Sequence, residues 1–210
     1  MNVLLTGGSG GLGNQLVKDL LDLGHTVFYT YNQNPSFFDN KNAKSLKVDF
    51  SNLSETECFL LQLKDIEIDV LINNYFNKLE KKHAHKLNKE EILNGTLNNI
   101  IPTIEITNSV IASMRKNKKG KIVNILTDYL KNSAPIGLSK YVAEKSYIES
   151  FMRSLQKENS NFNIDLHFIY PKIMFTKFAE IDSVQKENII ASGEFSKIED
   201  ISKQIINVIQ

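Results

Sequence analysis

The stretch NVLLTGGSGGLGNQLV, residues 2–17, sets the organisation of this chain. It opens with a short run without charge, which predicts a buried strand, and then passes through five glycines. It continues as a helical pattern with Leu12, Leu16 and Leu20 on one stripe. Glycine lets the backbone approach a pyrophosphate closely, and a helix N-terminus offers free N–H groups and a positive dipole. The stretch therefore predicts a dinucleotide-binding turn, with an ordinary strand-to-helix turn as the alternative.

The composition narrows the class of protein. A chain of 210 residues can bury a full core, and no repeat or linker divides it, so we expect a single domain over residues 1–210. The net charge of +1 argues against a nucleic-acid partner, and a lone cysteine excludes an intramolecular disulfide. There is no leader pattern and no apolar run of the roughly 20 residues that a membrane helix needs. We therefore expect a soluble, cytoplasmic protein without a membrane contact.

Strand and helix patterns alternate along the rest of the chain. We expect a helix over residues 54–63 with Ser54 as its cap, and a longer one over 89–114 that Pro102 kinks or divides. Several strands are continuous apolar runs, which implies a parallel sheet buried on both faces. The prediction is an α/β fold with a doubly wound, mostly parallel sheet, helices on both faces, and the ligand at the carboxyl ends of the strands. Another helix is expected at 139–158, and further strands at 26–31, 45–48, 69–72, 121–126 and 163–170.

A tyrosine and a lysine lie one helical turn apart on the helix expected after the fifth strand. Tyr141 and Lys145 share a face at this spacing. An ammonium beside a phenol favours the phenolate and lowers the pKa of the tyrosine, as a proton donor working near neutral pH requires. The alternative is a solvated surface pair. The loop before this helix starts at the carboxyl end of a central strand, which favours the chemical interpretation.

With these residues in place, the chain resembles the short-chain dehydrogenase/reductase family, which has a Rossmann fold. Thr6-Gly7, Gly11 and Gly13 match the cofactor loop of that family, and Tyr141 and Lys145 match its tyrosine and lysine. The catalytic residues that the resemblance implies are Asn99, Thr127, Tyr141 and Lys145. The cofactor-binding residues that it implies are Thr6, Gly7, Ser9, Gly11, Leu12, Gly13, Tyr31, Asn32, Asp49, Phe50, Asn73, Asn74, Tyr141, Lys145, Pro171 and Thr176.

The resemblance also implies a role for each catalytic residue. Tyr141 gives or takes the proton of the substrate oxygen while a hydride passes between a nicotinamide cofactor and a carbonyl or alcohol carbon. Thr127 hydrogen-bonds that oxygen, and Lys145 lowers the pKa of the phenol and binds the ribose. Asn99 anchors a water relay to the lysine. No metal is expected.

The sequence departs from the family pattern at four places. Thr127 stands where the family usually has serine; its hydroxyl can make the same hydrogen bonds, and Ser133 is a second hydroxyl in that loop. Tyr75 and Phe76 replace a small pair after the fourth strand, and Lys172 replaces a glycine. These changes keep a non-catalytic nucleotide-binding or partner-binding protein open as the alternative. The glycine pattern also fits a nucleotide-sugar epimerase or dehydratase, but the carboxyl-terminal substrate domain of those enzymes is missing from this sequence.

The end of the second strand bears on the choice of cofactor. An acid there would bind the ribose hydroxyls of NAD and repel the 2′-phosphate of NADP. Tyr31 and Asn32 stand there instead, which favours NADP(H) over NAD(H) and an NADP-dependent ketoreductase. The family's usual last strand is missing. We therefore expect a homodimer formed through the two long helices, with a small carbonyl or alcohol compound as substrate.

Two other features have simpler explanations. His83 and His85 resemble a metal pair, but no third ligand lies nearby in a lysine-rich stretch, so we expect a solvated loop. Cys58 lies between apolar residues of a predicted helix, and we expect it to face the core.

Overall fold

The computed structural model describes residues 1–179 and 181–210. Within them, six parallel strands form one sheet in the order β3-β2-β1-β4-β5-β6. The doubly wound sheet expected from the sequence is confirmed, although strand ends differ from the predicted ones by one or two residues. The strands are β1 (Asn2–Leu5), β2 (Thr26–Tyr31), β3 (Ala43–Lys47), β4 (Val70–Asn73), β5 (Gly120–Ile125) and β6 (Ile164–Ile169).

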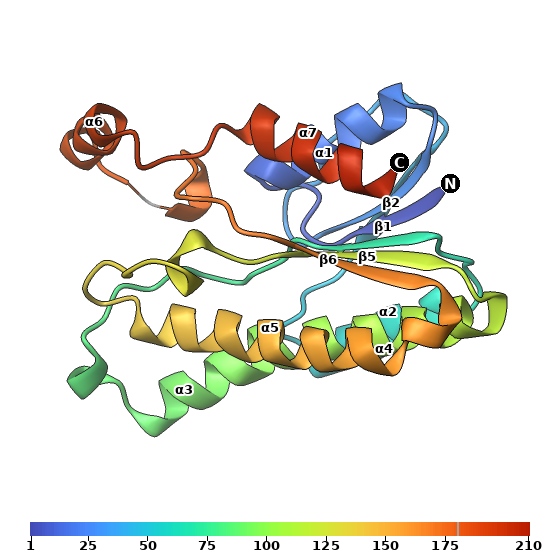
Figure 1. Ribbon diagram of the computed structural model, residues 1–210, viewed down its shortest axis with the longest axis horizontal. Helices are drawn as coiled ribbons and strands as arrows, with labels where there is room; N and C mark the ends of the chain where they lie inside the picture. Colours follow the sequence, from blue (N-terminus) through green and yellow to red (C-terminus); the bar gives the residue numbers. More distant parts are fainter. Residues whose placement is uncertain (180) are drawn as a thin grey trace.

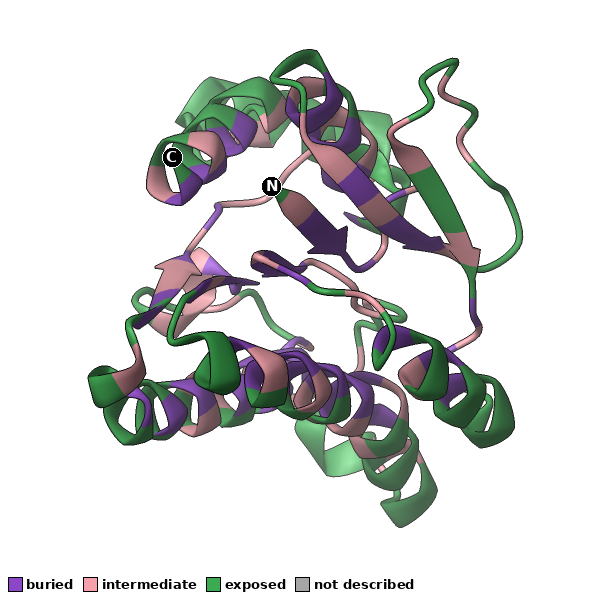
Figure 2. Cartoon of the chain, turned by 90° about the vertical axis from the view of Figure 1, so that its right-hand side faces the viewer, coloured by how far each residue is buried: buried purple, intermediate pink, exposed green. Residues whose placement is uncertain are grey.

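Helices cover both faces of the sheet (Figure 1). One face packs against α1 and α7, where Leu16 and Ile205 meet strand residues such as Val3. The other packs against α2, α4 and α5, where Ile106 and Met152 belong to the larger core cluster. Figure 2 shows buried residues (purple) on the sides of these helices that face the sheet. The helices are α1 (Gly11–Asp22), α2 (Leu53–Leu63), α4 (Ile101–Asn117), α5 (Ser139–Glu158) and α7 (Ile198–Ile209).

The start of α2 differs from the sequence-based expectation. Its cap is Asn52, whose side chain accepts hydrogen bonds from the backbone N–H groups of Ser54 and Glu55 at 3.1 and 3.3 Å. Asparagine caps a helix as well as serine does, and the cap lies two residues earlier than predicted. The same helix carries Cys58 on its exposed side, and the prediction that this thiol faces the core is wrong.

The long helical segment before β5 has three parts. It begins as α3 (Lys89–Gly95), passes through a π-helical turn (Thr96–Ile100) and continues as α4. Pro102 has no N–H to donate to the carbonyl four residues earlier, and the change of helix type lies just before it. The predicted division at this proline is thus present as a π-helical turn.

The segment after β6 folds over the carboxyl ends of the strands. It includes α6 (Ser183–Ser192), none of whose residues is buried, and an isolated parallel bridge between Ile173 and Phe195. No helix in the described part of the chain is long and apolar enough to span a membrane. Short 3-10 turns cover Ala84–Lys86, Asp128–Leu130, Ser160–Phe162 and Lys177–Ala179.

Candidate active site

The glycine turn lies where the sheet order reverses, since β1 pairs with β2 on one side and β4 on the other. Gly7 adopts a φ of +70°, which L side chains rarely adopt, and its N–H donates to the Thr30 hydroxyl at 2.8 Å. The N–H of Gly8 donates to the Thr30 carbonyl at 2.8 Å. A Cβ at Gly13 would collide with the Gly7 carbonyl, so a side chain at this position would displace the turn.

Helix α1 begins at the end of this turn, so its first backbone N–H groups lie beside the glycines. Its cap, Gly10, has no side chain to accept from them, and the first turn of the helix carries no acidic residue. The first N–H groups of a helix have no partner within it, and the helix dipole adds a partial positive charge there. The turn therefore has the electrostatics of an anion site.

Thr6 and Asn74 join the ends of β1 and β4. The Thr6 hydroxyl oxygen accepts from the N–H groups of Asn74 and Tyr75, each at 3.0 Å. The Asn74 amide donates in return to the carbonyls of Thr6 and Gly7 at 3.0 and 3.1 Å. These bonds fix the glycine turn to the loop after β4 and so shape the crevice between the two strands.

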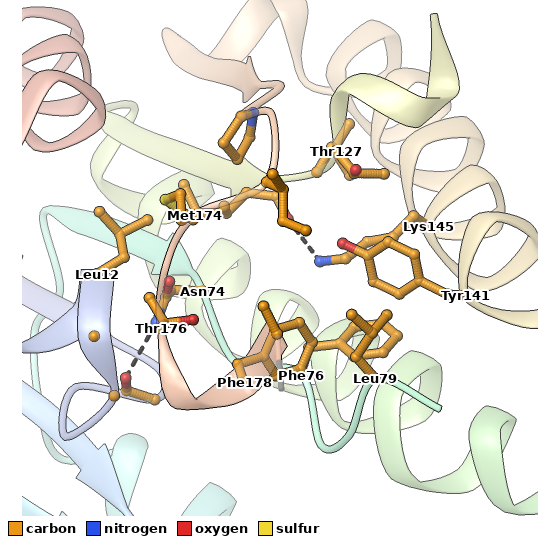
Figure 3. A pocket seen from close by; sticks show the side chains of 18 of the residues that line it. Leu12, Asn74, Phe76, Leu79, Thr127, Tyr141, Lys145, Met174, Thr176 and Phe178 are labelled. Carbon is orange, nitrogen blue, oxygen red and sulfur yellow. Dashed lines mark hydrogen bonds between the residues drawn. The ribbon is translucent and has the colours of Figure 1, made fainter. Parts of the chain in front are cut away.

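A cavity of about 730 Å³ opens at the carboxyl ends of the strands, and Figure 3 shows part of its lining. It runs from the glycine turn to the tyrosine and lysine of α5, so the fold brings these two distant motifs to one site. The predicted site residues that line it are Gly7, Ser9, Gly11, Leu12, Gly13, Tyr31, Asn32, Phe50, Asn74, Thr127, Tyr141, Lys145, Pro171 and Thr176.

Four predicted site residues lie outside this lining. Thr6 holds the Asn74 loop, as described above. The Asp49 carboxylate accepts from the N–H and hydroxyl of Ser51, and this bonding lowers the pKa of its carboxyl. The buried amide of Asn73 donates to Thr107 and Asn124. The Asn99 side chain binds α5 and the loop after β4, and its water relay to Lys145 stays a prediction.

Tyr141 and Lys145 are buried beside each other on α5 (Figure 3). The Lys145 amino group donates to the Ile125 carbonyl at 2.7 Å, and full burial lowers its pKa to about 7. Burial raises the pKa of Tyr141 to about 12, and the neighbouring Thr127 hydroxyl partly opposes this rise. The predicted lowering of the phenol pKa is therefore not seen. The amino group faces a backbone carbonyl and is itself desolvated, so it stabilises the phenolate little.

Thr127 lies just after β5, close to the tyrosine. Its hydroxyl accepts from the N–H of Tyr129 at 3.4 Å, and the side chain is 4% exposed. Two bonds hold this loop against the end of β6: Leu126 donates to the Ile169 carbonyl and Asp128 to the Pro171 carbonyl, at 2.8 and 2.9 Å. The hydroxyl thus sits on fixed backbone at the cavity wall.

Aromatic side chains that the sequence did not identify as site residues form the wall opposite. The Phe76 ring contacts those of Tyr141 and Phe178 edge-to-face, with centroids 5.1 and 6.0 Å apart. It also lies 4.7 Å from the amino group of Lys145. Phe76 was visible as a departure from the family pattern, but Phe178 belongs to a stretch without a motif, so nothing in the sequence marked it.

Comparisons with known proteins agree with this geometry. A family model described as short chain dehydrogenase matches residues 1–187. The chain belongs to the short-chain dehydrogenase family. That membership places it among oxidoreductases. The shared region includes both the glycine turn and the Tyr141–Lys145 pair.

Relatives of this short-chain dehydrogenase are distant. The 3-oxoacyl-(acyl-carrier-protein) reductase FabG of Haemophilus influenzae is 24% identical, and the match covers 96% of this chain and 87% of the relative. The very-long-chain 3-oxooacyl-coA reductase let-767 of Caenorhabditis briggsae is also 24% identical, over 85% of this chain and 61% of the relative. The chain thus spans about three fifths of the length of that second relative.

Solved structures share the fold. A 3-ketoacyl-(acyl-carrier-protein) reductase from Brucella melitensis, complexed with NADH, superimposes with a TM-score of 0.86 at 18% identity and covers 100% of this chain and 90% of its own. A short chain dehydrogenase from Leptospira borgpetersenii with bound NAD+ gives a TM-score of 0.85 at 22% identity, covering 97% and 83%.

Proposed function

We propose that this protein is an NAD(P)-dependent oxidoreductase that interconverts a carbonyl compound and an alcohol, with Tyr141 as the proton donor and acceptor. The observation that carries the proposal is the single cavity lining that includes the glycine turn, Thr127, Tyr141 and Lys145. A surface pair of tyrosine and lysine would not be buried, and it would not share a cavity with a turn suited to an anion.

The residues of the glycine turn fit a nicotinamide dinucleotide. The N-terminus of α1 suits a pyrophosphate, and Gly13 leaves the turn free of side chains. Tyr31, Asn32 and Phe50 would hold the adenosine half, and Lys145 with Thr176 the nicotinamide half. Two structural relatives are described with NADH or NAD+, which supports this assignment. When bound, the cofactor supplies or accepts the hydride.

The chain's own groups handle the proton. The Tyr141 hydroxyl donates to the substrate oxygen in reduction and takes the proton back in oxidation, and the Thr127 hydroxyl orients that oxygen. Lys145 has a pKa of about 7, so its amino group changes protonation state near neutral pH. It can therefore take up or release a proton beside the Tyr141 phenol. Asn99 acts indirectly, because its side chain binds α5 and the loop after β4.

The end of β2 favours NADP(H) over NAD(H). Tyr31 and Asn32 line the cavity there and bring no carboxylate that would repel a 2′-phosphate. The cationic residues of the cavity lining are Lys81, Lys145 and Lys172, none of which belongs to the second strand or the loop after it. The preference for NADP(H) therefore rests only on the absence of a carboxylate at the end of β2 that would repel the 2′-phosphate. It is expected to be modest.

The wall around Tyr141 suits an apolar substrate. Phe76, Leu79, Leu138 and Phe178 line the cavity on this side. Lys172 also lines it, but the amino group pairs with Glu194 at 3.0 Å. A ketone with apolar groups on the carbonyl carbon fits these surroundings better than a keto acid.

For assembly and location we keep the expectations drawn from the sequence as proposals. We propose a homodimer through the long helices, because α3 and α5 expose Leu93 and Tyr147, at 48 and 54% of their surface. One domain over residues 1–210 and a cytoplasmic location stay predictions.

Cofactor titration followed by a panel of carbonyl compounds tests the proposal. A change in NADPH fluorescence on binding, followed by oxidation of NADPH in the presence of an apolar ketone, is the expected result. Binding of either dinucleotide without turnover of any ketone, aldehyde or alcohol would favour the non-catalytic alternative. No binding of NADPH or NADH would exclude the oxidoreductase and a nucleotide-binding protein, and would leave the partner-binding alternative.

A further inference from the structure

Glu144 is a buried carboxylate inside the motif that carries Tyr141 and Lys145, and none of the roles above uses it. The residue is 5% exposed, and burial raises the pKa of its carboxyl. Its Oε2 accepts from the Asn99 amide at 2.9 Å, whereas its Oε1 has no hydrogen-bond partner in the described part of the chain. A buried carboxyl with an unused acceptor costs free energy, so a compensating role is expected.

The neighbouring backbone is shaped around this side chain. A Cβ at Gly95 would collide with Oε1 of Glu144, so the end of α3 comes this close to α5 because residue 95 is glycine. The π-helical turn that carries Asn99 starts at the next residue. Glu144 thus fills a place that the packing of α3 against α5 leaves for a long side chain.

Asn99 connects this carboxyl to the loop after β4. Its Oδ1 accepts from the N–H of Asn77 at 2.7 Å, and its Nδ2 donates to Glu144. The carboxylate oxygen can only accept, so Glu144 fixes the amide with its NH₂ group toward α5 and its oxygen toward Asn77. The reversed amide would set two donors against each other at Asn77 and two acceptors at Glu144.

Asn77 follows Phe76 in the chain, so the hydrogen bond from Asn77 to Asn99 also restrains the segment that carries Phe76. The Phe76 ring contacts both Tyr141 and the amino group of Lys145. We propose that Glu144 is a positioning residue: through Asn99 and the Asn77 amide, it holds the segment that carries Phe76 against Tyr141 and Lys145. Its effect on turnover rests on the proposed function, whereas its effect on the loop does not.

Amide hydrogen exchange measured by NMR tests the connection without any activity. Asn99→Leu removes the acceptor of the Asn77 N–H and should speed its exchange by on the order of tenfold or more. Glu144→Leu should do the same at Asn77, because the amide of Asn99 is then no longer oriented. Glu144→Gln keeps an acceptor oxygen for Asn99 and should stay close to wild type.

The Gly8 N–H, which donates to Thr30 on the far side of the cavity, is the reference amide. It should exchange at the same rate in all variants. Unchanged protection of Asn77 in Glu144→Leu would overturn the proposal, because Asn99 would then hold the loop alone. An equal loss at Asn77 and Gly8 would also overturn it, because Glu144 would then stabilise the whole fold and position nothing in particular.

Kinetics supply the second test. Glu144→Leu should lower kcat by on the order of tenfold with little change in KM, since the reacting groups lose alignment. Adding Asn99→Leu should cause little further loss, and Glu144→Gln should restore most of the rate. Additive losses in the double variant would overturn the proposed path. If the wild-type protein turns over no substrate, the proposed function fails while the exchange experiment still decides the role of Glu144.

Discussion

The amino group of Lys145 lies 4.7 Å from the centroid of the Phe76 ring. Phe76 stands where the family pattern has a small residue, and its aromatic ring lies beside the lysine. Burial lowers the pKa of Lys145 to about 7, and the nearby Glu144 carboxyl partly opposes this change. A lysine pKa this close to neutral leads to a pH dependence that can be measured.

Lys145 should make the stability of the fold depend on pH above neutrality. Its pKa is about 7 in the folded protein, against 10.5 for a lysine free of such surroundings. The unfolded chain binds more protons between these values, so the free energy of unfolding should rise with pH from about 7 toward 10. The slope contributed is at most about 1.4 kcal/mol per pH unit. Denaturant titrations at pH 7, 8 and 9 should show this rise in wild type relative to Lys145→Met. Parallel curves for the two proteins would contradict it.

Tyr141→Phe should remove most of the turnover and leave cofactor binding nearly intact. The ring still packs against Phe76, and only the transferable proton is lost, an effect worth roughly 10²–10⁴-fold in general acid catalysis. Steady-state kinetics and NADPH titration measure the two effects. Tyr147→Phe, on the exposed side of the same helix, is the control and should match wild type. Wild-type turnover in Tyr141→Phe would mean that another group donates the proton.

Gly13→Ala should abolish dinucleotide binding, because the added Cβ collides with the Gly7 carbonyl and displaces the turn. Gly10→Ala is the matched control. A Cβ there meets only the Gly7 carbonyl, at 3.6 Å, which is ordinary contact. Calorimetry with NADPH and NADH should show binding to Gly10→Ala but not to Gly13→Ala. Equal affinities in the two variants would place the dinucleotide elsewhere.

Asn32→Asp should reverse the cofactor preference. A carboxylate at the end of β2 can accept from ribose hydroxyls but repels a 2′-phosphate, so NADPH affinity should fall by on the order of tenfold or more while NADH affinity holds or rises. Asn34→Asp adds the same charge in the exposed loop nearby and should leave the preference unchanged. Clearly tighter binding of NADH than NADPH to the wild-type protein would show that the end of β2 does not set the preference as proposed.

The oligomeric state should be a dimer. Multi-angle light scattering should give twice the mass of the 23.9 kDa chain for wild type. Leu93→Glu, on the exposed face of α3, should give a monomer, whereas Leu61→Glu, at a position of α2 that is even more exposed, should not. A stable tetramer, or a dimer unaffected by Leu93→Glu, would refute the interface through the long helices.

Local patterns predicted the elements and their order well, because apolar runs, glycine turns and helical spacing act over a few residues. The six strands and the division of the long helix near Pro102 were predictable in this way. The cap of α2 was not, because Asn52 and Ser54 are both good caps and only the packed helix selects one. Cys58 was misplaced for a related reason. Apolar neighbours in sequence do not say which side of a short helix meets the core.

The sequence by itself determined the sheet, the glycine turn and the family to which the chain belongs, since these depend on residue types at fixed spacings. Only the tertiary structure decided what surrounds the catalytic pair. Phe76, Asn99 and Glu144 come from three separate segments and meet through side-chain bonds and ring contacts that no spacing encodes. Burial, which sets the pKa values of Tyr141 and Lys145, is likewise a property of the whole packed molecule.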